Sequence, residues 1–104
     1  MSRYTVKQLW EERYGKQERV QDYAGRWMFK SACGNPYSNY EPTIDHIRPI
    51  SCGGKDIKEN IVLCNVETNE EKGNDFPHWK TGTGAYRAER KKGKGNAYTI
   101  VKER

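Results

Sequence analysis

The sequence predicts a small α+β domain with a single hydrophobic core over residues 1–104. Three observations lead to this fold class. A chain of 104 residues is too short to build two cores of useful size. One segment near the N-terminus has helical periodicity, whereas several later segments are short β-type runs separated by Gly and Pro. Hydrophobic residues make up 34% of the chain and charged residues 32%, so we expect a small core that a bound metal, a partner or a substrate helps to stabilise.

The first part of the chain is predicted to contain one helix and one strand. Residues 5–14 are expected to be helical, because Thr5 and Gln8 have capping-box spacing and Gly15 can end the helix. The apolar residues of this helix lie near one face, which would pack on the rest of the domain: Val6, Leu9, Trp10 and Tyr14. Residues 26–30 follow a turn-like segment and carry large apolar side chains, which predicts a strand that contributes to the core.

The middle of the chain is predicted to form two strands and a helix. Residues 43–47 and 61–63 are short β-type runs, and a Gly-Gly pair lies between them, so we expect an antiparallel hairpin. Asn65 can cap a helix over residues 66–72, which Gly73 would end. This order places two short strands directly before a short helix.

Positive charge is concentrated in the last quarter of the chain. The formal charge is −1 over residues 1–78 and +6 over residues 79–104. The functional interpretation is a segment that binds a polyanion such as a nucleic acid. The alternative is a solvated basic end that keeps the protein in solution.

The same basic segment is predicted to contain a second hairpin. Gly82 and Gly84 are expected to form a flexible joint. Beyond it, residues 85–90 and 97–101 would pair around a basic turn at residues 91–96. A disordered basic tail is the alternative.

The residues that could perform chemistry lie between positions 45 and 72. Asp45 and His46 are adjacent at a predicted strand end, and Asn60 lies just before the next strand. Asn69 and Lys72 are three residues apart and share a helix face, so folding the two strands and the helix together would gather all five. Carboxylate and amide oxygens suit Mg²⁺, and a histidine with an unperturbed pKa of about 6.5 suits a general base. Each residue alone is more often structural, but the set together indicates attack on a phosphodiester.

This segment resembles the HNH nuclease motif, also called the ββα-metal fold. The motif reads as Asp-His, a Pro soon after, Gly-Gly, an Asn before a short apolar strand, and then Asn or His with Lys three residues later. Those positions are occupied here by Asp45-His46, Pro49, Gly53-Gly54, Asn60, Asn69 and Lys72. The match has a core at residues 41–77 and is similar to small stand-alone bacterial and phage HNH nucleases. It implies a ββα-metal (HNH) core to which an N-terminal helix and extra short strands are added.

The resemblance also implies a role for each matched residue. His46 would be the general base, and Asp45 and Asn69 would bind one divalent metal. Asn60 would hydrogen-bond near His46 and orient it, and Lys72 would contact a phosphate. Because the last metal position is Asn69 and not histidine, the implied metal is Mg²⁺ or Mn²⁺.

A structural zinc is not expected. Many HNH proteins carry two Cys-x-x-Cys pairs, but Cys33, Cys52 and Cys64 lack this spacing, so we expect free cysteines in a reducing compartment. Cys64 follows the second strand and is expected in the core. The other histidine, His78, is expected to be a packing or surface residue.

The predicted function is that of a metal-dependent endonuclease that hydrolyses phosphodiester bonds of DNA in the cytoplasm of a bacterial or phage-infected cell. No run of about 18 apolar residues occurs, so no membrane partner is expected. Double-stranded DNA is the expected partner, and a homodimer or a protein partner stays open. The alternative is a non-catalytic DNA-binding or interaction module that keeps the HNH fold. Seven basic residues are expected to bind DNA: Arg48, Lys55, Arg87, Arg90, Lys91, Lys92 and Lys94.

Overall fold

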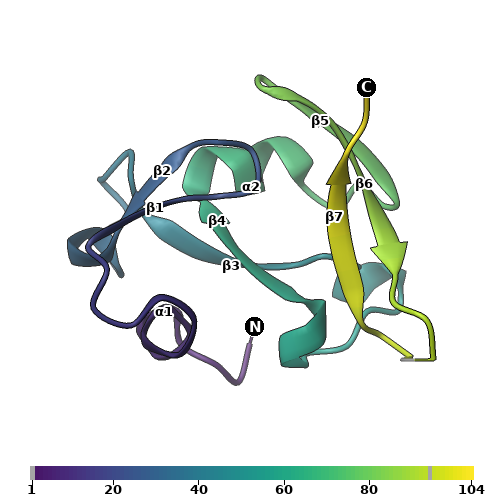
Figure 1. Cartoon of the computed structure of the whole chain (residues 1–104), viewed down its shortest axis with the longest axis horizontal. Helices are drawn as coiled ribbons and strands as arrows, with labels where there is room; N and C mark the ends of the chain where they lie inside the picture. The colour runs from purple at the N-terminus through teal and green to yellow at the C-terminus, as the bar shows by residue number, and fades with distance from the viewer. Residues whose placement is uncertain (1, 94) are drawn as a thin grey trace.

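The computed structural model describes residues 2–93 and 95–104, and its helices and strands form an α+β fold with three small antiparallel sheets (Figure 1). The sheets are β1–β2, β3–β4 and β5–β6–β7. In chain order the elements are α1 (Val6–Tyr14), β1 (Arg19–Gln21), β2 (Trp27–Phe29), β3 (Pro42–His46), β4 (Ile61–Asn65), α2 (Val66–Lys72), β5 (His78–Thr81), β6 (Gly84–Arg90) and β7 (Tyr98–Lys102). The predicted α+β class is confirmed. Within the described residues, neither helix has the length and apolar character needed to cross a membrane.

Helix α1 begins and ends where its capping residues predict. Thr5 Oγ1 accepts a hydrogen bond from the Gln8 N–H at 3.1 Å, and the Gln8 side chain accepts one from the Thr5 N–H at 3.4 Å. Gly15 follows the last helical residue with a positive φ of 60°, a conformation that costs glycine little. Leu9 and Trp10 are fully buried, so the predicted inner face of the helix is confirmed.

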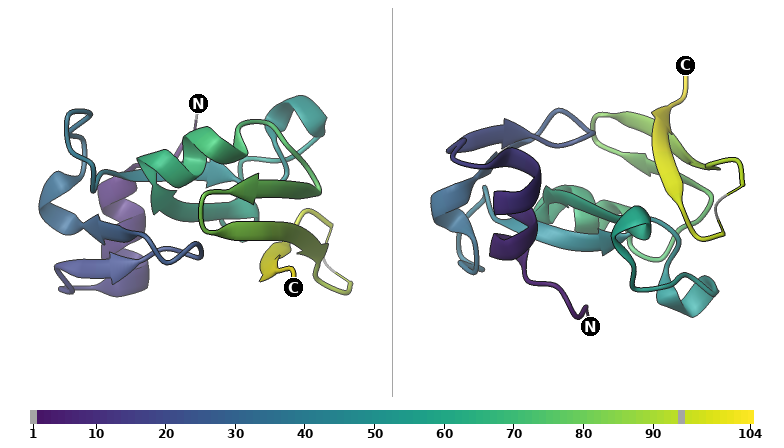
Figure 2. Two further views of the ribbon diagram at one scale, coloured as in Figure 1. Left: turned by 90° about the horizontal axis from the view of Figure 1, so that it is seen from above. Right: turned by 60° about the horizontal axis from the view of Figure 1, so that its bottom comes forward.

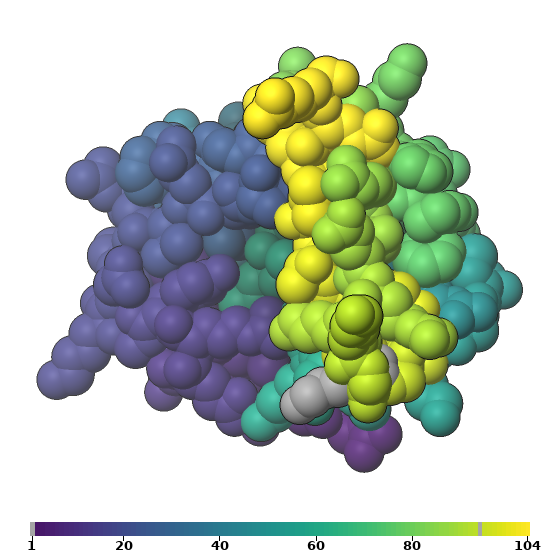
Figure 3. All heavy atoms as spheres, turned by 45° about the vertical axis from the view of Figure 1, so that its right-hand side comes forward, coloured from purple at the N-terminus to yellow at the C-terminus, as the bar shows by residue number. Residues whose placement is uncertain are grey.

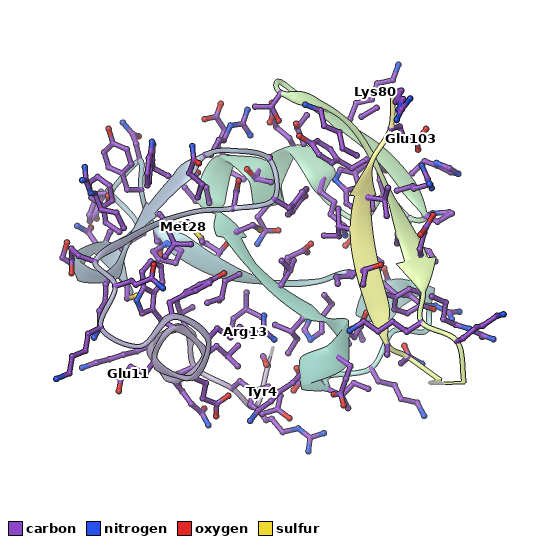
Figure 4. The ribbon with its side chains drawn as sticks, in the orientation of Figure 1. Tyr4, Glu11, Arg13, Met28, Lys80 and Glu103 are labelled. Carbon is purple, nitrogen blue, oxygen red and sulfur yellow. The ribbon has the colours of Figure 1, made fainter. Side chains whose placement is uncertain are left out.

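The main core lies between α1, β2 and β4 (Figure 2). Arg13 adds polar contacts to this packing, because its guanidinium reaches from α1 and donates to the carbonyl oxygens of Ile61 and Lys58 (Figure 4). The N-terminal part of the chain therefore supports the β3–β4 hairpin. The buried members of the core are Leu9, Trp10, Met28, Ile61 and Leu63.

Strands β3 and β4 and helix α2 form one continuous unit. The two strands pair antiparallel along their full lengths, and α2 begins at the residue after β4. Asn65 Oδ1 accepts a hydrogen bond from the Glu67 N–H at 2.8 Å, which caps the helix as predicted. The hairpin is confirmed, although β3 begins one residue before the predicted range 43–47. Its connection contains two 3₁₀ turns, Ile50–Cys52 and Lys58–Asn60.

The C-terminal sheet differs from the prediction at its first strand. β5 pairs with β6, so Gly82 and Gly84 belong to a tight hairpin, and the prediction of a flexible joint was wrong. The predicted second hairpin is confirmed as β6 and β7, and Lys94 in its turn lies outside the described residues. Trp79 and Tyr86 pack with Ala24 in a second small core, which attaches this sheet to the turn before β2.

Candidate active site

The end of β3 opens into a pocket of about 210 Å³ that Asp45 and His46 both line. The pocket is completed by Pro49, Ile50 and Ser51 from the β3–β4 connection and by Asn74 after α2. The two adjacent residues that the sequence singled out therefore share one accessible hollow. Asn74 was not predicted as a site residue, although it lies within the matched segment 41–77.

Asp45 combines burial with an incompletely bonded carboxylate. Its side chain is 9% exposed, and Lys72 Nζ lies 3.3 Å from Oδ2. This contact is an ion pair, and within the part of the chain that the structure describes Oδ2 is a buried oxygen without a hydrogen-bond partner. Burial raises the pKa of Asp45, and the Lys72 ammonium opposes that rise. A divalent cation at Oδ2 would satisfy the oxygen and favour the ionised form, so the residue fits a metal ligand.

Lys72 is fully buried beneath the site. Its ammonium lies near Asp45 Oδ2, donates a hydrogen bond to the His46 carbonyl oxygen at 3.3 Å, and lies 5.1 Å from the centroid of the Trp79 ring. Its side chain has an exposed fraction of 0%. The sequence predicted that this lysine contacts a phosphate, but in this arrangement the ammonium faces the protein and not the solvent.

Asn69 lies on the same side of β3 as Asp45. Thr43 and Asp45 are two residues apart on the strand and point to one face. Asn69 Nδ2 donates to Thr43 Oγ1 at 2.9 Å and to the Ile44 carbonyl at 3.3 Å. Lys72, which contacts Asp45, lies about one turn later on the same helix. The amide nitrogen of Asn69 is thus used to attach α2 to β3, and Oδ1 is the atom that could bind a metal.

His46 is held by a carboxylate that the sequence did not identify. Its Nε2 lies 2.8 Å from Asp56 Oδ1, in the connection between β3 and β4. The same carboxylate accepts hydrogen bonds from the Ser2 hydroxyl and from the Arg3 N–H, each at 2.7 Å. The Arg3 N–H, the Ser2 hydroxyl and His46 hold the pKa of Asp56 well below its usual range. No motif spacing marks Asp56, because only the folded connection brings it to His46.

Asn60 organises the main chain of the connection, because its side-chain hydrogen bonds go to main-chain groups and not to the imidazole. It is fully buried, and its Oδ1 accepts from the Arg48 N–H at 2.9 Å. Its Nδ2 donates to the carbonyl oxygens of Arg48 at 3.0 Å and Lys55 at 2.9 Å. Gly54 packs against this turn so closely that a Cβ would lie 1.8 Å from the Arg48 carbonyl oxygen, which excludes any larger residue. Asn60 therefore acts on the loop that follows His46.

Four of the basic residues predicted to bind DNA lie exposed near the β6–β7 turn. Arg90, Lys91 and Lys92 are exposed at the end of β6 and in the turn. Lys55 is exposed beside them, because its N–H donates to Asn96 Oδ1 at 3.2 Å. Figure 3 shows the β6–β7 hairpin, coloured lime to yellow, running down one face of the molecule.

Arg48 and Arg87 already have partners within the protein. Arg48 donates to the Cys52 carbonyl at 2.7 Å and to the Tyr98 hydroxyl at 3.3 Å, which joins the motif loop to β7. Arg87 forms an ion pair with Glu89 at 2.7 Å on the outer face of the sheet. Lys94, the seventh predicted residue, lies outside the described residues.

His78 and Cys64 do not line the pocket, whereas Cys52 adjoins it, because its Sγ lies 4.0 Å from the carbonyl oxygen of Asn74. His78 is exposed and its Nδ1 lies 2.6 Å from Glu103 Oε1, beside a surface hollow of about 490 Å³. Figure 4 labels Glu103 and Lys80, which line that hollow. Cys64 is buried, as predicted, and burial raises the pKa of its thiol. Across residues 2–93 and 95–104, no three His, Cys, Asp or Glu side chains gather as a metal site.

Comparison with known proteins identifies the segment that contains the pocket. Residues 35–78 match the model of a family described as HNH endonuclease. These residues, called here the HNH segment, are similar to HNH endonucleases. The HNH segment runs from the loop before β3 to the first residue of β5, and it indicates a nuclease-type function with a nucleic acid as substrate. Comparisons with curated proteins and with solved structures found no match.

Proposed function

We propose that this HNH protein is a metal-dependent endonuclease that hydrolyses phosphodiester bonds of DNA. The observation that supports the proposal is one juxtaposition within the HNH segment. Among the described residues, a buried carboxylate oxygen of Asp45 has no hydrogen-bond partner, and the adjacent His46 lines the same pocket. The first group suits a metal and the second suits proton transfer from water.

The chain's own residues divide the work in this proposal. Asp45 and Asn69 hold one Mg²⁺ or Mn²⁺, which when bound stabilises negative charge on the phosphate and on the leaving 3′-oxygen. His46 accepts the proton of the attacking water. Asn60 fixes the loop after His46 through its three main-chain hydrogen bonds.

Lys72 has a revised role in the proposal. Because its ammonium is buried against Asp45, we infer that it keeps this carboxylate ionised and in place, and that it does not contact the phosphate directly. The His46 carbonyl and the Trp79 ring complete its surroundings, so the lysine is held in one position.

DNA binding is assigned to the exposed basic residues of the β6–β7 turn together with Lys55. The Lys55–Asn96 hydrogen bond joins this turn to the connection that also carries Asp56. A duplex contacting Arg90, Lys91 and Lys92 would therefore lie against a surface continuous with the motif loop.

A plasmid-nicking assay tests the proposal. The protein is incubated with supercoiled plasmid and Mg²⁺ or Mn²⁺, with and without excess chelator. We expect nicked or linear plasmid only with free metal. Cleavage that persists in the chelator would remove the metal from the proposal.

One observation favours a second candidate, a DNA-binding module without catalysis. Lys72 Nζ already lies 3.3 Å from the Asp45 oxygen that a metal would use, so this carboxylate has a cationic neighbour within the protein. The exposed basic turn would give such a module its affinity for DNA. Binding of the plasmid without cleavage at any concentration of either metal would support this candidate.

A further inference from the structure

The carboxylate–imidazole contact between Asp56 and His46 is built from three distant parts of the chain. His46 ends β3, Asp56 lies in the β3–β4 connection, and Ser2 and Arg3 precede α1. The two N-terminal donors and the imidazole use both oxygens of Asp56, at 2.7 to 2.8 Å. The side chains of His46 and Asp56 are 14% and 19% exposed, so solvent competes only weakly for this contact.

The contact with Asp56 determines which imidazole nitrogen of His46 has a lone pair available to accept a proton. An ionised carboxylate can only accept hydrogen bonds, so Nε2 of neutral His46 carries the proton that points at Asp56. The lone pair then resides on Nδ1. A general base needs that lone pair, and the side chain that holds it lines the pocket with Asp45.

We infer that Asp56 is a positioning residue for His46, and that Ser2 and Arg3 hold Asp56 in its place. The inference rests on the proposed role of His46 as general base. Asp56 does not touch substrate; it sets the tautomer and the ring orientation of the histidine that does. In a merely structural role, the Asp56 contact would tie the N-terminal segment to the loop and leave the tautomer of His46 unaffected.

The chain provides a matched control, because its second histidine has the opposite arrangement. His78 presents Nδ1 to Glu103, whereas His46 presents Nε2 to Asp56. Long-range ¹H–¹⁵N correlation spectra distinguish the two tautomers of a neutral imidazole. Spectra of the wild-type protein at alkaline pH should show His46 with the proton on Nε2. A His46 signal of the Nδ1–H form in the folded wild-type protein would overturn the inference, whatever the behaviour of the variants.

The variant Asp56→Asn removes the charge and keeps the shape of the side chain. We expect it to change the His46 signals and to leave His78 unchanged, whereas Glu103→Gln should do the reverse. Amide spectra and urea unfolding verify that both variants are folded. Unchanged His46 signals in folded Asp56→Asn would contradict the inference.

The kinetic measurement separates positioning from binding. In Asp56→Asn, kcat for plasmid cleavage should fall on the order of 10–100-fold with little change in KM, and Glu103→Gln should cleave at the wild-type rate. An unaltered kcat in folded Asp56→Asn would overturn the positioning role. If the wild-type protein cleaves no DNA, the proposed function fails, and the tautomer spectra still decide whether Asp56 orients His46.

Discussion

Asp45 and Lys72 are a buried ion pair in which each charge is stabilised by the other. Burial of an ion costs several kcal/mol, and an opposite charge at short distance offsets that cost only while both are present. With side chains 9% and 0% exposed, neither residue can turn to water when its partner is removed. The proposed metal ligand is therefore also a structural residue, and the effects of its substitution have to be read together with protein stability.

The first prediction concerns this pair. Lys72→Met should lower the free energy of unfolding by about 3–5 kcal/mol, because Asp45 is left buried without a cation. Adding Asp45→Asn to Lys72→Met should recover part of that loss. Urea denaturation of the two single variants and the double variant measures both effects. Losses that simply add in the double variant would show that the two charges are not coupled.

The second prediction concerns the proposed base. His46→Ala should lower plasmid cleavage about 10²–10⁴-fold and leave the affinity for DNA nearly unchanged, because a general base acts in the chemical step. Cleavage and band-shift assays on the same preparation provide the two numbers. His78→Ala is the control and should keep the wild-type rate. Equal cleavage by His46→Ala and wild type would exclude His46 as the base.

At the scale of elements, α2 is connected to two other parts of the chain through its outer residues. Glu71 forms an ion pair with Arg26 before β2 and accepts hydrogen bonds from the Gly82 N–H in the β5–β6 turn. The Arg26 guanidinium, followed by the Gly82 N–H, lowers the pKa of Glu71. One carboxylate thus joins the helix of the HNH segment to the hairpins on either side.

The third prediction follows from the direction of that pKa shift. Because the pKa of Glu71 is lower in the folded protein, the unfolded chain binds more protons in acid, and stability rises with pH in that range. The contribution is complete above about pH 4.3 and is lost as the pH falls towards the folded-state pKa. Glu71→Gln should therefore reduce the gain in unfolding free energy between about pH 3 and pH 5.

Urea denaturation at several pH values measures this effect. Glu70→Gln is the matched control, because it removes the same charge from an exposed position on the same helix. The same pH dependence in Glu71→Gln and wild type would show that the Arg26 contact contributes nothing to stability in solution.

Elements with local signals could be predicted from the sequence, whereas those that depend on a partner could not. Both helices are bounded by their own capping residues, Thr5 and Asn65, so neither needs the rest of the fold to be recognised. β1 is three residues long and is a strand only because β2 lies beside it. In the sequence, Gly82 and Gly84 resemble a flexible joint, and only the pairing of β5 with β6 makes them part of a tight hairpin. Asp56 could not be predicted for the same reason, because its proposed role depends on the contact with His46, ten positions earlier, and not on a motif.

At the scale of the whole molecule, the excess positive charge and the HNH segment are distinct in sequence but adjacent in space. Residues 79–104 carry +6, and residues 1–78 carry −1. Among the hydrogen bonds that connect the parts, those from Lys55 to Asn96 and from Arg48 to Tyr98 join the motif loop to the β6–β7 hairpin. Asn96 at the end of the basic turn and Tyr98 at the start of β7 therefore lie beside the motif loop.

The fourth prediction concerns this turn. Replacing Arg90, Lys91 and Lys92 with Gln should reduce the log–log salt slope of DNA affinity by about 2.7 if each residue contacts one phosphate. The wild-type protein should then lose about 40-fold more affinity than the variant between about 50 and 200 mM salt. Fluorescence anisotropy with a labelled duplex at several salt concentrations provides the slopes.

The control for this prediction removes three positive charges elsewhere. The three exposed residues are Lys7 on α1, Lys16 between α1 and β1, and Arg19 at the start of β1. Replacing them with Gln should leave the salt slope within error of the wild-type value. If both triple variants lower the slope equally, the position of the basic turn has no special effect and the affinity for DNA depends only on the net charge of the protein.

The main core also decides how far the HNH segment can be treated as a transferable module. Ile61 and Leu63 of β4 are buried against Leu9, Trp10 and Met28, all of which precede the matched residues 35–78. A graft of those 44 residues onto another protein would carry the pocket but expose the apolar side of its own hairpin. Any chimaera built from this protein would have to include α1 and β2, or a host surface shaped to replace them.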